Sequence, residues 1–227
     1  IVASHVKRDL REVHHKITGT VKFNMAIAIP CAVGLAVLAQ PIMTMLFPAQ
    51  GEYHDLAAHL LTAGSSAAVF YALSTITTSI LQGTNHMMTP VLHSAVSLVI
   101  HIAVVVALLY AGFGVWALLI GNVVFPLIVC TLNCRSVSRL LRYRWNIASI
   151  FIIPLLCALV MGAVCRGVYA LVMKLTHLVI LSFGVSFVVA VAVYGLLLLK
   201  SHCFSKKELR ELPMGGKLLH LAIKLHL

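Results

Sequence analysis

Charged residues are scarce in this chain, and acidic residues are the scarcest of all. Of the 227 residues, 10% are charged and only six are acidic, whereas roughly 25% are charged in soluble domains. We expect all six acids to lie in loops or tails, outside the long apolar runs: Asp9, Glu12, Glu52, Asp55, Glu208 and Glu211. The apolar runs therefore lack the carboxylates on which proton and sodium relays in membranes depend.

Motifs for catalysis and for metal or cofactor binding are also missing. The sequence contains no HExxH pair and no glycine-rich phosphate loop. Cys130 and Cys134 lie one helical turn apart without further ligands nearby, so we interpret them as small apolar residues of a packed helix. The basic residues lie in patches between apolar runs, which is not the pattern of a nucleic-acid interface. We predict no enzyme activity, no cofactor, no metal and no nucleic-acid partner.

What the chain has in abundance is apolar length. Hydrophobic residues make up 61% of the sequence, and a transmembrane helix needs about 20 predominantly apolar residues. Six runs meet that length, and only the fifth contains an Arg: 23–47, 57–82, 88–111, 113–133, 147–172 and 177–199. The predicted fold class is an all-α membrane protein with six transmembrane helices.

Lysine and arginine are distributed unequally between the two sides that six crossings define. Fifteen of the 17 lie in residues 1–22, 134–146 and 200–227, and only Arg166 and Lys174 fall on the other side. Because basic residues are retained in the cytosol, both termini are predicted to be cytosolic.

The predicted domains are a basic segment (1–22), four helices (23–133), a basic loop (134–146), a helix pair (147–199) and a basic tail (200–227). The tail is interpreted either as an interfacial helix or as a solvated end.

Polar residues recur on one face of three consecutive spans. In each span they are separated by the three- and four-residue steps that place side chains on one side of a helix. The third predicted span carries a midplane histidine, and span 113–133 repeats the pattern with Asn122, Pro126 and Asn133. We call eight of these residues the polar seam: Tyr71, Thr75, Thr78, Gln82, His93, Ser97, His101 and Asn122.

Two interpretations of the polar seam remain open. It suits interhelical hydrogen bonds within a bundle, and it equally suits one wall of a hydrated substrate pathway. His101 belongs to the same alternatives, as either a packing residue or a titratable group at a cavity, since imidazole changes charge near neutral pH. A third group of candidates, the basic loop residues, is interpreted either as an orientation signal or as a contact for anionic lipid headgroups: Arg135, Arg139, Arg142 and Arg144.

Short motifs along the chain resemble a known transporter family. Residues 30–42 (PCAVGLAVLAQPI), followed by Leu46-Phe47, resemble the ninth helix of polysaccharide-biosynthesis flippases related to stage V sporulation protein B and to lipid II flippases. Residues 81–83 (LQG) with Pro90 resemble the turn between helices ten and eleven, and residues 110–117 (YAGFGVWA) resemble the turn before helix twelve. These flippases belong to the multidrug, oligosaccharidyl-lipid and polysaccharide exporter superfamily.

The resemblance implies a larger architecture than 227 residues can build. It implies roughly fourteen helices in two lobes plus a terminal pair, with this chain supplying part of the second lobe (23–133) and the terminal pair (147–199). The first residue is Ile1 and no signal peptide is expected, so we expect a fragment whose partners include the missing N-terminal lobe. Membrane lipids and a lipid-linked saccharide substrate are the other implied partners.

Three functions are compatible with these expectations. The first is part of a flippase that translocates a lipid-linked oligosaccharide or peptidoglycan precursor across the bacterial cytoplasmic membrane by alternating access. The second is a cation-coupled multidrug exporter of the same superfamily, which needs an acidic ion site. The third is a membrane scaffold that does not transport.

Overall fold

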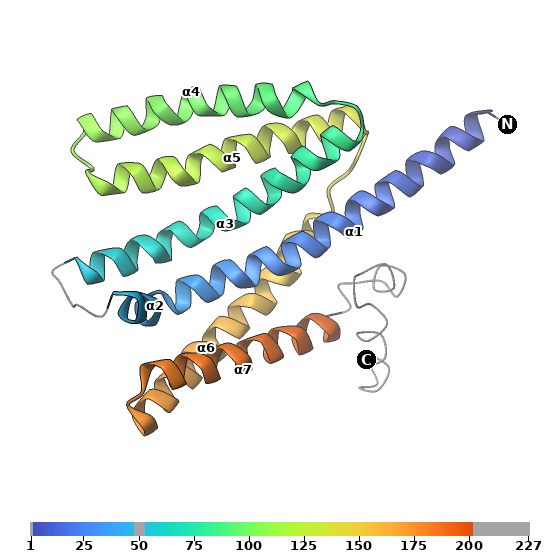
Figure 1. The fold of residues 1–227 in the computed structure, drawn as a ribbon. Helices are drawn as coiled ribbons and strands as arrows, with labels where there is room; N and C mark the ends of the chain where they lie inside the picture. The colour runs from blue at the N-terminus through green and yellow to red at the C-terminus, as the bar shows by residue number, and fades with distance from the viewer. Residues whose placement is uncertain (1, 48–52, 202–227) are drawn as a thin grey trace. The chain divides into compact units, whose positions relative to one another are not determined.

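The chain folds as a set of long helices, shown as a ribbon in Figure 1. A computed structural model describes residues 2–47 and 53–201. Those two ranges contain seven α-helices, one π-helical turn and no strand. The elements are α1 (Val2–Val37), α2 (Ala39–Leu46), α3 (His54–Gly83), α4 (Met88–Tyr110), α5 (Val115–Leu140), the π-turn η1 (Ala148–Ile152), α6 (Ile153–Thr176) and α7 (Val179–Lys200).

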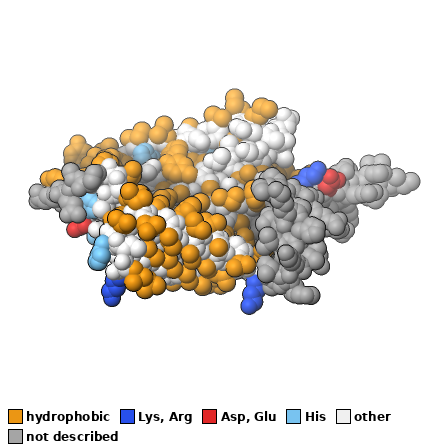
Figure 2. Space-filling view, turned by 60° about the horizontal axis from the view of Figure 1, so that its bottom comes forward, with side chains coloured by type: hydrophobic (Ala, Val, Ile, Leu, Met, Phe, Trp, Pro, Cys, Tyr) orange, Lys and Arg blue, Asp and Glu red, His pale blue; other side chains and the backbone are white. Residues whose placement is uncertain are grey.

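Six helical segments are long and apolar enough to cross a membrane. They are Glu12–Val37, His54–Gly83, Met88–Tyr110, Val115–Leu140, Ala148–Thr176 and Val179–Lys200. Figure 2 shows the same property on one face of the molecule, where hydrophobic side chains dominate and the few Lys and Arg lie at the margins. The predicted all-α fold class with six membrane-spanning helices is therefore confirmed.

The first span ends earlier than the sequence predicted. The expected run 23–47 is divided at Leu38, where α1 stops and the short helix α2 begins. Pro41 explains the position of the break, because a proline clashes with the carbonyl four residues earlier, which here belongs to Val37. Pro41 is accommodated in the first turn of α2, where its missing N–H has no helical partner to lose.

Three acidic residues lie in helices, which corrects the expectation that all six lie in loops or tails. Asp9 and Glu12 are part of α1, and Asp55 is in the first turn of α3. Glu12 pairs with Lys16 one turn later at 2.9 Å, and an i,i+4 pair of this order supports a helix without any apolar burial. The charged segment before the first span is therefore helical, and Glu12 and Asp55 still lie at the ends of their spans.

The predicted basic loop and tail differ in how far the structure describes them. Helix α5 continues to Leu140, so the first half of the predicted loop 134–146 is helical and only residues 141–146 are not. The tail beyond residue 201 lies outside the described residues, and so does its interpretation as an interfacial helix.

The chain divides into two compact units, residues 1–146 and 147–227. In the first unit α5 packs between α3 and α4, and α1 packs on the other side of α3, so that the long helices follow the order α1, α3, α5, α4 across one layer (Figure 1). In the second unit α6 and α7 pack against each other as a hairpin. The assignment of these units to a transporter lobe and a terminal pair stays a prediction.

Tight turns make the neighbouring helices antiparallel. Between α4 and α5, Gly112 and Gly114 have φ angles of 82° and 53°, a left-handed conformation that glycine adopts without a steric penalty. Between α6 and α7 the corresponding position is His177, with φ 53°. The short turn between α4 and α5 sets the register in which their polar side chains meet.

Candidate functional site

One edge of α3 carries polar side chains that are exposed in the described part of the chain. Tyr71 and Thr75 lie one turn apart near the middle of α3, and Gln82 lies near its end; all three are exposed. The fourth predicted residue of this helix, Thr78, is half-buried because it turns toward α5. The polar face predicted from helical spacing is thus a boundary between exposed surface and the α3–α5 contact.

A side-chain bridge joins α3 to α5 at this boundary. The Tyr71 hydroxyl donates to Asn122 Oδ1 at 2.9 Å, and Asn122 itself is exposed. Because Oδ1 is turned toward Tyr71, the two N–H donors of the amide are directed elsewhere, and they have no partner among the described residues. Asn122 is the eighth residue of a 26-residue span, so these free donors lie well inside the membrane-spanning part of α5.

Beneath the exposed row lies a buried network centred on Asn133. Its side chain is fully buried and connects three helices. Its amide nitrogen donates to Thr78 Oγ1 at 2.9 Å and to the Ser74 carbonyl at 3.4 Å on α3, while its oxygen lies 2.7 Å from His93 Nδ1 on α4. Asn133 belongs to the polar pattern predicted for span 113–133 but not to the eight residues of the polar seam.

The network fixes which nitrogen of His93 carries a proton. A carbonyl can only accept, so the contact with Ser74 requires the nitrogen of the Asn133 amide on that side and its oxygen on the other. His93 must then donate from Nδ1. The other ring nitrogen, Nε2, lies 3.4 Å from the Ser136 hydroxyl, and Ser97 donates to the His93 carbonyl at 2.6 Å. In the neutral ring the proton is therefore on Nδ1.

His101 repeats this arrangement two turns further along α4. Its Nδ1 lies 2.8 Å from the Gly121 carbonyl, which again requires the proton on Nδ1. The ring meets Phe125 edge-on, with centroids 5.9 Å apart at 77°. Gly121 permits this approach, because an added Cβ would lie 2.9 Å from His101 Cε1. The absence of a side chain at residue 121 is what brings α4 and α5 together here.

The polar seam thus separates into two groups. Tyr71, Thr75, Gln82 and Asn122 are exposed; the Tyr71 hydroxyl donates to Asn122, and the Thr75 hydroxyl donates to the Tyr71 carbonyl of its own helix. The remaining four lie within the contacts between helices: Thr78, His93, Ser97 and His101. Helical periodicity identified the polar faces, whereas only the packing of α5 between α3 and α4 decides which side chains remain accessible.

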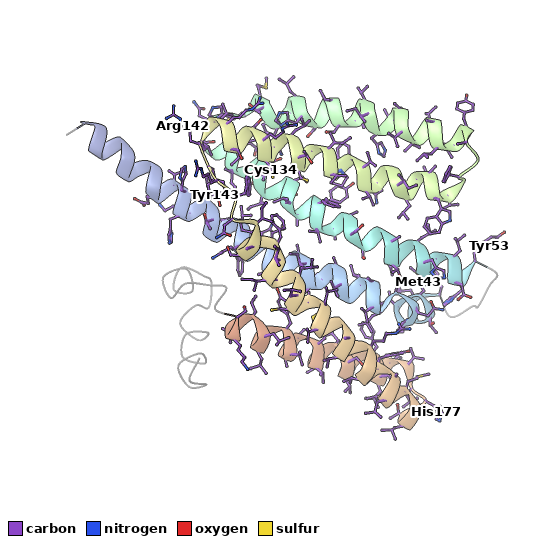
Figure 3. The ribbon with its side chains drawn as sticks, turned by 180° about the vertical axis from the view of Figure 1, so that it is seen from behind. Met43, Tyr53, Cys134, Arg142, Tyr143 and His177 are labelled. Atoms are coloured by element: carbon purple, nitrogen blue, oxygen red, sulfur yellow. The ribbon has the colours of Figure 1, made fainter. Side chains whose placement is uncertain are left out.

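The four arginines of the basic loop lie together at one end of the first unit. Arg135 and Arg139 occupy the last turns of α5, and Arg142 and Arg144 follow in the non-helical residues 141–146; all four are exposed. Figure 3 shows the labelled Arg142 at one end of this unit and Tyr53 at the opposite end.

Within residues 2–47 and 53–201, no three His, Cys, Asp or Glu side chains lie close enough to hold a metal ion. The cysteines described in that part are free thiols, including the Cys130 and Cys134 pair on α5. Cys130 donates to the Leu127 carbonyl, a contact that suits a helix-packing residue.

Known proteins match part of this chain. Residues 5–107, which run from α1 through most of α4, match the MatE family model. The chain is 26% identical over 109 residues to the lipid II flippase MurJ of Bacillus subtilis (strain 168), a stretch that covers 48% of this chain and 20% of that protein. No solved structure matches. The chain therefore spans about a fifth of the length of the curated relative it matches, and the predicted resemblance to this exporter superfamily is confirmed.

Proposed function

We propose that the chain is part of a flippase that moves a lipid-linked oligosaccharide or peptidoglycan precursor across a bacterial cytoplasmic membrane by alternating access. The match to the MatE model and the similarity to a lipid II flippase support the class of transporter. The observation that carries the proposal is the exposed amide of Asn122, whose N–H donors have no partner among the described residues although the residue lies inside a span.

An unpaired amide is costly in hydrocarbon. Moving an amide out of water without a compensating hydrogen bond costs roughly 2–7 kcal/mol, so the exposed edge of α3 and α5 is a poor surface for lipid tails. The same edge suits an aqueous cavity shared with the preceding lobe. In transporters built from two lobes, such a cavity lies near the midplane between the lobes.

The chemistry of the exposed group suits the hydroxyl-rich sugar part of such a substrate. Tyr71, Thr75, Gln82 and Asn122 offer hydroxyl and amide groups and no charge, which are the partners that sugar hydroxyls require. The buried network behind them joins α3, α4 and α5 through Asn133. In this proposal the three helices move as one wall, and the exposed row on that wall contacts the saccharide.

In the same proposal, the distribution of lysine and arginine sets the orientation of the chain across the membrane. The arginine-bearing end of α5 and the N-terminal part of α1 face the cytosol, and Tyr53 at the opposite end of the first unit faces outward (Figure 3). Both ends of the chain are then cytosolic. We propose no catalytic role for any residue.

A cation-coupled multidrug exporter remains the alternative within the superfamily. Such a transporter needs a membrane-embedded carboxylate. Residues 56–207 contain neither Asp nor Glu, so in this alternative the ion site would have to lie elsewhere in the protein. A scaffold without transport is the remaining alternative, and it assigns no task to the exposed amide of Asn122.

Apolar substitutions at matched positions test the proposal. Thr75→Leu on the edge of α3 and Thr131→Leu on α5 replace residues with the same environment, since both are exposed and both hydroxyls donate to the carbonyl four residues earlier, at 2.8 and 2.6 Å. Thr131 lies nine residues from Asn122, which places it on the opposite side of α5. Only Thr75 is on the proposed substrate wall.

The measurement is translocation of lipid-linked sugar by the protein expressed from its own gene in cells depleted of their flippase. We expect Thr75→Leu and Asn122→Leu to abolish rescue at normal membrane levels of protein, and Thr131→Leu to rescue like the wild type. Equal activity in all three variants, or failure of the unsubstituted protein with both peptidoglycan and capsule precursors, would contradict the proposal.

A further inference from the structure

The segment that follows α5 alternates between arginine and aromatic residues. Residues 142–146 form neither helix nor strand, and Arg142 has a φ angle of 49°. Within this segment Tyr143 is buried with 5% of its surface exposed, whereas Arg142 and Arg144 on either side of it are exposed. The sequence RYRW therefore places aromatic rings inward and guanidinium groups outward.

Hydrogen bonds from α1 hold this segment in place. The Tyr143 hydroxyl lies 2.8 Å from Thr18 Oγ1, and Thr18 in turn donates to the His14 carbonyl at 2.9 Å. His14 Nε2 donates to the Leu141 carbonyl at 2.7 Å. The segment is thereby attached to α1 at two successive points.

Trp145 attaches the same segment to α5. Its indole N–H donates to Ser138 Oγ at 2.7 Å and lies 3.3 Å from the Cys134 carbonyl. Its ring also meets Tyr143 edge-on, with centroids 5.0 Å apart at 89°. The backbone of this segment loses its conformational freedom when the chain folds, because these contacts hold it in place. Arg142 and Arg144 are therefore presented from an ordered backbone, and a ligand that binds them does not have to order it.

No carboxylate of the surrounding sequence balances the four arginines. Residues 56–207 contain no Asp or Glu, and the ion pairs that the described part of the chain shows join Glu12 to Lys16 and His54 to Asp55. Arg135 and Arg139 lie one turn apart on α5, next to the face that receives Trp145. The cluster is a set of exposed guanidinium groups whose counter-charge comes from outside residues 56–207.

We propose that Arg135, Arg139, Arg142 and Arg144 form a binding surface for the phosphodiester headgroups of anionic phospholipids. The guanidinium group matches phosphate oxygens with two parallel hydrogen bonds, which an ammonium group cannot make. The cluster lies at the end of the span Val115–Leu140, where headgroups meet the apolar core, and Leu140 is exposed beside it for the acyl chains. Tryptophan and tyrosine are typical of the same depth.

A surface that binds headgroups and a signal that orients the chain in the membrane require different properties of these four side chains. Orientation depends on the number of positive charges, so Lys serves as well as Arg. A headgroup site depends on the guanidinium fork and on the ordered backbone that presents it. Substitution of Arg by Lys therefore separates the two functions, because it keeps the charge and removes the paired hydrogen bonds.

The experiment measures binding of fluorescent phosphatidylglycerol to the purified full chain in neutral detergent. We expect Arg142→Gln with Arg144→Gln to weaken binding by about fivefold for each arginine lost, and the Lys/Lys variant to fall between this variant and the wild type. The matched control is Arg166→Gln with Lys174→Gln, which removes the same charge from two exposed residues of α6; it should bind like the wild type.

A second variant tests the ordered backbone while all four arginines remain. Tyr143→Phe removes the bond to Thr18 and should lower affinity with no change in charge. Unlabelled phosphatidylglycerol should displace the probe, whereas phosphatidylcholine and inorganic phosphate should not. The proposal is overturned if the Lys/Lys variant equals the wild type, if the control loses as much affinity as the Gln/Gln variant, or if inorganic phosphate competes as well as the lipid.

Discussion

Gly121 is the residue at which a single methyl group should have the largest effect on the packing of α4 against α5. A Cβ at this position would lie 2.9 Å from His101 Cε1 and closer still to Val105 Cγ2. Val105 is β-branched and has one strongly preferred rotamer in a helix, so it cannot move aside without shifting α4. Gly121→Ala should therefore separate the two helices and stretch the bond between His101 and the Gly121 carbonyl.

The expected change in the free energy of unfolding on Gly121→Ala is the sum of three terms, two of which destabilise the protein and one of which stabilises it. Overpacking costs typically 1–3 kcal/mol, and loss of one interhelical hydrogen bond in a membrane adds about 0.6 kcal/mol. Against this, Ala stabilises a helix interior by about 1 kcal/mol relative to Gly. We expect a net loss of about 0.6–2.6 kcal/mol. Gly34→Ala is the matched control, because a Cβ at Gly34 meets nothing within 4 Å, and it should gain about 1 kcal/mol.

The assay is equilibrium unfolding in mixed micelles, followed by tryptophan fluorescence, for both variants and for a double variant. Adding Val105→Ala to Gly121→Ala removes the side-chain atom nearest to the new methyl group. The stability lost in the double variant should therefore be smaller, by about 1 kcal/mol or more, than the sum of the losses in the two single variants. If Gly121→Ala stabilises the protein as Gly34→Ala does, then α4 and α5 do not pack closely at this position and the reasoning is refuted.

Three further predictions follow from the same helix layer and its orientation. His93→Leu and Asn133→Leu should each destabilise by about 1–3 kcal/mol because each leaves a buried partner unpaired, while the double variant should cost less than their sum by about 0.6–1.7 kcal/mol in the same unfolding assay; strict additivity would contradict the 2.7 Å contact between the two side chains. His101→Leu removes the donor to the Gly121 carbonyl and should destabilise by about 1–3 kcal/mol, whereas His101→Gln keeps a donor and should lose less stability; equal losses in the two variants would contradict the 2.8 Å contact. In a variant without native cysteines, a cysteine at Tyr53 should react with an impermeant thiol reagent in intact cells and one at Ser138 should not; the reverse pattern would overturn the proposed orientation.

The number and positions of the spans were predictable because hydropathy acts locally. A run of about 20 apolar residues has few alternatives to a transmembrane helix, whatever surrounds it. Two of the differences concern the ends of α1, where local backbone chemistry and not apolar burial decides. Helix α1 extends back to Val2 through a charged segment supported by pairs such as Glu12 with Lys16, and it ends early because Pro41 acts on Val37.

The polar seam was only partly predictable, for a different reason. Spacing along one helix gives the angle of a side chain, but not the neighbour it meets. Tyr71 and Asn122 are 51 residues apart, and His93 and Asn133 are 40 apart. Which of these pairs is exposed depends on the register set by the turns and by the close approach at Gly121. Asn133 therefore looked like any other polar residue of its span until the helices were placed beside one another.

The direction of the hydrogen bonds around Asn133 has a consequence for how the helices can move. Each donor points the same way, from the His93 ring on α4 through the Asn133 amide to α3. The amide oxygen serves α4 and both amide hydrogens serve α3, so α5 cannot slide against either neighbour without leaving a buried polar group unpaired. The three helices are thus coupled through one side chain, and a displacement of any one of them is opposed by both of the others.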